Sequence, residues 1–133
     1  MKPEIYVEFT LVFDNDFDVT KITNITGMIP YECKNRAENR INPITNKHLE
    51  GFWTVRSSVY TEFDAEKALN DIVTKIVSQT DDIVDICHEY DGEAIFRVVS
   101  WFNTKNTPAI YFERNFLDIV QKLNATIQIN LYI

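Results

Sequence analysis

Alternation of apolar and polar residues predicts three strands along the chain. Residues 4–13 place an apolar side chain at every second position, and residues 126–133 do the same. A shorter run at about 52–58 alternates around Trp53 and Val55. A period of two residues is typical of a strand with one face buried and the other exposed. We therefore expect three half-exposed strands.

Apolar residues at helical spacing predict four helical segments. The clearest covers residues 64–78 behind an Asp64 cap, and a shorter one continues after Thr80. Another spans about 115–123. The remaining helix follows an Asp18 cap as far as Thr26, where Gly27 supplies the left-handed residue that ends it.

Two further segments complete the predicted order of elements. Residues 93–102 are apolar at almost every position except Arg97, as in a central strand covered on both faces. Residues 28–51 contain prolines, asparagines and scattered charges without a sustained period, which indicates a long irregular loop. We therefore expect a single α+β domain over residues 1–133, with a four- to five-stranded, mainly antiparallel sheet and helices packed on one face.

Composition and charge exclude several classes of protein. The 133 residues carry a net charge of -7, the wrong sign for a protein that binds nucleic acid through its phosphates. No stretch has the ~20 apolar residues of a membrane helix. The two cysteines form no disulfide framework, which favours a reducing compartment and a cytoplasmic location.

Motifs for cofactors, metals and nucleophiles are weak or absent. Asp14, Asp16 and Asp18 match the first ligands of a calcium loop, but Val19 stands where such a loop needs glycine. The residues able to bind zinc lack ligand spacing: Cys33, His48, Cys87 and His88. We predict no metal and no cofactor. A non-enzymatic role is favoured, while an enzyme whose site is assembled in space stays open.

Two charged clusters are candidate binding sites. Asp81, Asp85 and Glu89 recur at a spacing of four residues and line one helix face, forming an acidic ridge suited to a basic partner. A solvated face is the simpler interpretation of this ridge. The loop at 28–51 gathers positive charge that could hold an anionic ligand, next to the Trp53 strand: Arg36, Arg40, His48 and Trp53. Its simpler interpretation is a solvated loop with local ion pairs.

Several short motifs together resemble a known bacterial family without an assigned function. They are the opening strand, Asp14-Asn15-Asp16-Phe17-Asp18, the segment at 22–30, the Trp53 strand with Ser57, and the closing helix and strand at 123–132. We identify this as the domain-of-unknown-function family numbered 4279. The segment at 31–50 departs from the shorter, glycine-containing link usual there. The resemblance implies a small bacterial cytoplasmic domain, and it assigns no catalytic residue.

These features favour a non-enzymatic protein-interaction module of the immunity or inhibitor type. Its partner would be a basic protein, bound by the acidic ridge or by the open polar face of the outer strands. A homodimer is a further partner consistent with the sequence. The alternative is a domain centred on the loop at 28–51 that binds a small anionic ligand or acts on it.

Overall fold

The computed structural model describes residues 2–133. The strands of its main sheet are β1 (Glu4–Phe13), β2 (Glu32–Lys34), β5 (Gly51–Arg56), β6 (Gly92–Trp101) and β7 (Thr126–Tyr132). The helices are α1 (Val19–Thr26), α2 (Glu66–Ile76), α3 (Thr80–Tyr90) and α4 (Arg114–Leu123). Shorter elements are β3 (Ile41–Asn42), β4 (Lys47–His48) and the 3-10 helices η1 (Arg36–Glu38) and η2 (Val77–Gln79). Among these residues no helix is long and apolar enough to cross a membrane.

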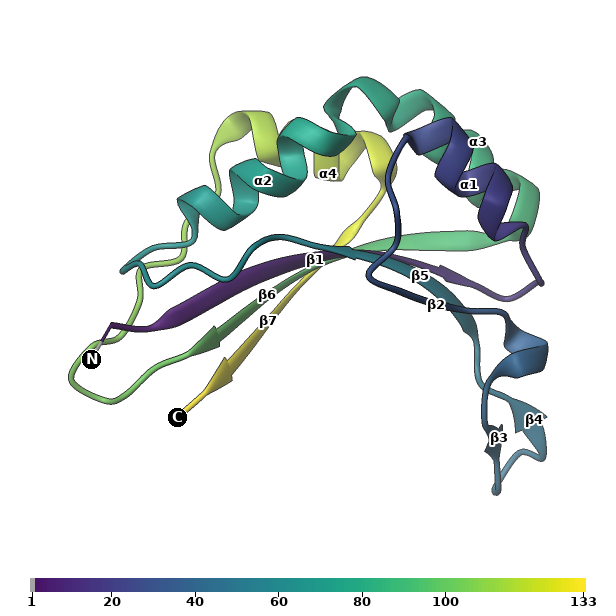
Figure 1. The fold of residues 1–133 in the computed structure, drawn as a ribbon, viewed down its shortest axis with the longest axis horizontal. Coiled ribbons are helices and arrows are strands. Elements are labelled where there is room, and N and C mark those ends of the chain that lie inside the picture. Colours follow the sequence, from purple (N-terminus) through teal and green to yellow (C-terminus); the bar gives the residue numbers. More distant parts are fainter. Residues whose placement is uncertain (1) are drawn as a thin grey trace.

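The main sheet has the strand order β2-β5-β1-β6-β7, and β3 pairs only with β4 in a small hairpin. The pairs β2–β5, β5–β1 and β1–β6 are antiparallel, whereas β6 and β7 are parallel. Figure 1 shows the four α-helices on one side of the sheet and the β3–β4 hairpin projecting beyond the end of β5. The predicted α+β fold, with helices on one face of a mainly antiparallel sheet, is confirmed.

The core lies between the helices and one face of the sheet. Odd-numbered residues of β1 are fully buried there, because successive side chains of a strand point to opposite faces. The helices contribute the other half of this core, including Leu69, Ile72, Ile76, Ile83, Ile86, Phe116 and Ile119. The even-numbered residues of β1 and their cross-strand neighbours form the opposite face, which no helix covers (Figure 1). We call it the bare face.

Local signals determine where the helices begin and end. The Asp18 carboxylate accepts a hydrogen bond from the Lys21 amide, and Gly27 has a φ of 69° in the left-handed region. Both are as predicted. The Asp64 cap is displaced by one residue, since Ala65 occupies the N-cap position of α2. Asp64 still accepts a hydrogen bond from the Glu66 amide at 3.0 Å, which satisfies a donor of the first turn.

Two segments differ from the sequence prediction. The segment at 28–51 is not wholly irregular, since it contains β2, η1, β3 and β4. Elements of two or three residues are too short to produce a detectable period. This segment is also anchored, because the Asn35 side chain bonds both the N–H and the carbonyl of Phe17. The second difference concerns β6, which is an inner strand with helices on only one of its faces.

Candidate functional site

Four polar side chains form a row across the bare face. The strand register places Glu8 of β1 directly opposite Arg56 of β5 and Arg97 of β6. Gln128 of β7 continues the row beside Arg97. One Glu8 oxygen, Oε2, lies 2.9 Å from Arg56 Nη2, and the other, Oε1, lies 3.4 Å from Arg97 Nη1. Each carboxylate oxygen therefore faces one guanidinium. We call these four residues the arginine–glutamate row.

The row is partly shielded from solvent although it lies on the bare face. Glu8 is only 8% exposed, a position that a carboxylate occupies only when it is well paired. The Arg56 guanidinium lies between two aromatic rings, 4.4 Å from the centre of Tyr6 and 3.9 Å from that of Tyr31. Burial is the largest single influence on the pKa of Arg56 and lowers it, but the hydrogen bond with Glu8 and the charge interactions with Glu8, Tyr6 and Tyr31 together raise that pKa above its usual value. The row thus holds Glu8 between two guanidinium groups in a partly buried setting.

A groove of about 340 Å³ lies beside this row, over β1, β5 and β2. Its floor includes the hydroxyls of Thr10 and Thr54, which are hydrogen-bonded to each other and nearly buried. Its rim carries Glu32, Glu50 and Arg97. The groove is therefore open and polar, and of a size to receive one or two side chains of a partner.

The charges around the groove are unevenly compensated. Arg97 is paired with Glu8, whereas Glu32 and Glu50 form no ion pair within residues 2–133. In total the lining carries three carboxylates and one guanidinium. Since opposite charges attract most strongly where solvent is partly displaced, the groove favours a cationic group.

Comparison with protein families matches residues 3–133 to the family described as Domain of unknown function (DUF4279). The chain belongs to this family. The match covers nearly the whole chain and confirms the resemblance that its motifs indicate. No curated protein and no solved structure matches the chain.

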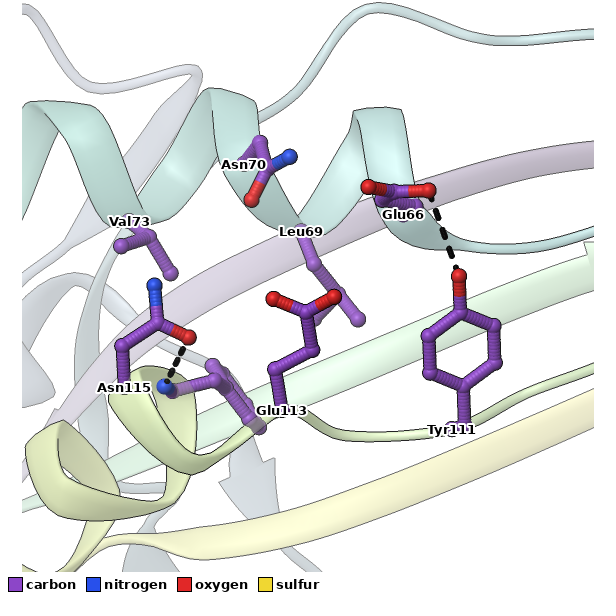
Figure 2. A pocket seen from close by; sticks show the side chains of 8 residues that line it. Glu66, Leu69, Asn70, Val73, Tyr111, Glu113 and Asn115 are labelled. Carbon is purple, nitrogen blue, oxygen red and sulfur yellow. Dashed lines mark hydrogen bonds between the residues drawn. The ribbon is translucent and has the colours of Figure 1, made fainter.

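A second, smaller cleft lies between α2 and the segment that leads into α4 (Figure 2). Glu66 and Glu113 bring carboxylates to it, and the Tyr111 hydroxyl donates a hydrogen bond to Glu66 at 3.2 Å. Burial and the nearby Glu66 carboxylate raise the pKa of Tyr111, so its hydroxyl stays protonated. Across residues 2–133 no group of three or more acidic, histidine or cysteine side chains is placed to hold a metal ion. The cleft thus presents a hydrogen-bonded phenol and two carboxylates.

The three residues of the predicted acidic ridge all lie exposed on α3. Asp81 pairs with Lys122 of α4 at 2.9 Å, and Glu89 pairs with Lys21 of α1 at 2.6 Å. These ion pairs connect α3 to its two neighbouring helices. They also neutralise two of the three charges, which leaves Asp85 as the ridge residue without an ion pair in the described part of the chain.

The predicted ligand-binding residues of the 28–51 segment are only partly brought together. Arg36, Arg40 and His48 lie around η1 and the β3–β4 hairpin. The Arg36 guanidinium donates a hydrogen bond to the backbone carbonyl of Asp14 at 3.0 Å, so it helps to hold this segment against the residue that follows β1. Trp53 is fully buried in the core and does not reach the surface on which the other three lie. The inclusion of Trp53 in a surface site is therefore wrong.

Sequence reasoning missed the residues that build the row and the groove. Glu8 contacts Arg56 and Arg97 across separations of 48 and 89 residues, which no local pattern encodes. A faint signal exists in Arg97, the single charged residue between Ala94 and Trp101. An isolated charge in an inner strand needs a partner on the same face, and only the strand register shows that Glu8 supplies it.

Proposed function

We propose that this protein is a non-enzymatic binding module that takes a basic segment of a protein partner in the groove of its bare face. The observation that carries the proposal is the composition of the groove. Glu32 and Glu50, whose carboxylates form no ion pair with any described residue, stand at its rim above a floor of hydroxyls. A lysine or arginine side chain entering the groove would find acceptors for its charge and for its N–H donors.

The charge of the whole chain supports the same class of partner. A net charge of -7 on 133 residues attracts a basic protein over distances of about a Debye length, ~8 Å at physiological salt. Long-range attraction of this kind accelerates encounter, whereas the groove would supply the specific contacts. The acidic ridge contributes to the first effect, since Asp85 forms no ion pair among residues 2–133 and lies between two carboxylates that do.

The proposed setting is the cytoplasm, where the two free thiols Cys33 and Cys87 would stay reduced. A small acidic protein that binds a basic partner without chemistry fits an inhibitor or immunity type of role. In that role the partner would be a basic toxin or nuclease whose cationic surface is covered by the bare face.

The experiment uses an array of lysine- and arginine-containing peptides, followed by titration of the strongest binder into the isotope-labelled protein. We expect backbone amide shifts to concentrate at Glu32, Thr54 and Arg97. The double variant Glu32→Gln with Glu50→Gln should weaken binding by about tenfold or more, a loss of ~1.4 kcal/mol.

A matched control removes the same amount of charge from the ridge, as Asp85→Asn with Glu89→Gln. Because both double variants change the net charge equally, a contact in the groove predicts a large loss only for the first. Equal losses in the two variants would show that the peptides sense only the net charge. Shifts confined to α3 would place the partner on the ridge instead of the groove.

A further inference from the structure

The two edges of the main sheet are built very differently. β2 is only three residues long, and two of those residues are charged, Glu32 and Lys34. β7 is seven residues long, and residues 125–133 contain no charged side chain and no proline. Short strands and charges are the usual protection of an edge against pairing with another chain. β7 lacks both.

The backbone of β7 offers a regular row of unused hydrogen-bonding groups. Its Tyr132 carbonyl accepts a hydrogen bond from the Phe102 amide at 2.9 Å, so even-numbered residues of β7 point their backbone groups towards β6. Backbone groups alternate in direction along a strand. The N–H and C=O of Ile127, Ile129 and Leu131 therefore point outward, away from the sheet.

Exposed apolar side chains lie along the same edge. Ile129 and Leu131 are 44% and 53% exposed on the helix side of β7. Leu117 of α4 is 45% exposed, and it lies roughly 140° around the helix from Lys122, which contacts α3. Leu117 therefore points away from α3, and its helix α4 leads directly into β7. We call the exposed side of β7 together with Leu117 the β7 edge.

We infer that the β7 edge binds the β7 edge of a second copy of this chain, with the two strands antiparallel about a two-fold axis at Ile129. This register places Ile127 opposite Leu131 of the second copy, and Gln128 opposite Asn130. Apolar side chains then meet apolar ones on the helix side, and amides meet amides on the bare face. In this register the outward N–H and C=O groups of Ile127, Ile129 and Leu131 face the same groups of the second copy. These residues therefore occupy the hydrogen-bonded positions of an antiparallel ladder.

Charge favours a second copy at this edge and at few other places. Two chains of net charge -7 repel each other where their acidic surfaces meet, whereas β7 brings together strands without charged side chains. The paired strands would span ~23 Å, and with α4 alongside the contact would be about 20 Å deep, or roughly 900 Å² for the two copies together. That area lies below the ~1,200 Å² at which specific stable interfaces begin, in the range of weak complexes, so we expect a dissociation constant in the micromolar range.

The first test is the mass of the protein in solution between about 1 μM and about 1 mM, a range that brackets micromolar dissociation. We expect the mass to rise from 15.6 kDa towards twice that value. Ile129→Lys places two cations directly opposite each other, and it should raise the dissociation constant by more than about tenfold. The matched control is Ile44→Lys at a 91% exposed residue near the β3–β4 hairpin, which should dimerise like the unchanged protein.

The second test needs no variant and measures hydrogen exchange at low and high protein concentration. Amides of Ile127, Ile129 and Leu131 should exchange more slowly at high concentration, while those of Gln128 and Asn130, already bonded to β6, should not change. A monomer at every concentration would overturn the inference. So would a dimer that survives Ile129→Lys, one that Ile44→Lys dissociates, or one without the alternating protection.

Discussion

The two faces of the main sheet are made from alternate residues of the same strands, yet they are stabilised differently. On the helix side, β1 and β6 bury apolar side chains such as Phe9 and Phe96 against four helices. On the bare face the same strands bury Glu8, which two arginines neutralise. Apolar burial is non-directional, whereas the ion pairs depend on geometry. The bare face can therefore form specific polar contacts that the helix side cannot.

The largest effect is expected from a single residue of the helix side. Phe96 is fully buried and packs against the rings of Phe9 and Phe116, with centroids 4.9 and 5.0 Å away. Phe96→Ala should reduce the free energy of unfolding by about 3–5 kcal/mol, measured by urea denaturation. Ile95→Ala is the matched control, because it truncates the neighbouring residue on the bare face. A similar loss in both variants would remove the distinction between the two faces.

The next largest effect should come from Glu8 on the bare face. Glu8→Ala leaves Arg56 and Arg97 without their shared carboxylate, at sites where both side chains are about three-quarters buried. We expect the free energy of unfolding to fall by about 1–3 kcal/mol. Arg97→Ala should cost less, because Glu8 then keeps Arg56 as its partner. If Arg97→Ala costs more than Glu8→Ala, the carboxylate is not the centre of the row.

A smaller effect is expected at the floor of the groove. Thr54→Val keeps the shape of the side chain but leaves the buried Thr10 hydroxyl without its partner, at a cost of about 1 kcal/mol. The double variant Thr10→Val with Thr54→Val removes both hydroxyls and should recover part of this loss. Urea denaturation of Thr10→Val, Thr54→Val and the double variant completes a double-mutant cycle, which measures the interaction between the two hydroxyls. Strictly additive losses would mean that the two hydroxyls do not interact.

The sequence predicts the helix side far better than the bare face, and the reason is physical. The core depends on local periodicity, so the alternation of residues 4–13 and the spacing in α2 were enough to predict the main elements. The row and the groove depend on register, which brings residues as far apart as Glu8 and Arg97 together. The short strands within residues 28–51 escaped prediction for a third reason, because strands of two or three residues are too short to show a period.

The smallest effect concerns the reactivity of the Cys87 thiol rather than stability. It measures how far water is excluded from the helix side of the sheet. Burial, with a contribution from Glu93, raises the pKa of the Cys87 thiol to about 11. A raised pKa means less thiolate at neutral pH, and at pH 8 only about one thiol in a thousand would be ionised. In a Cys33→Ser background, the alkylation rate by iodoacetamide should rise about tenfold per pH unit up to about pH 10, without a plateau. The same protein in urea should reach its plateau near pH 9, close to the ~8.5 pKa of a free thiol. A plateau near pH 9 in the folded protein as well would show that water reaches Cys87 freely.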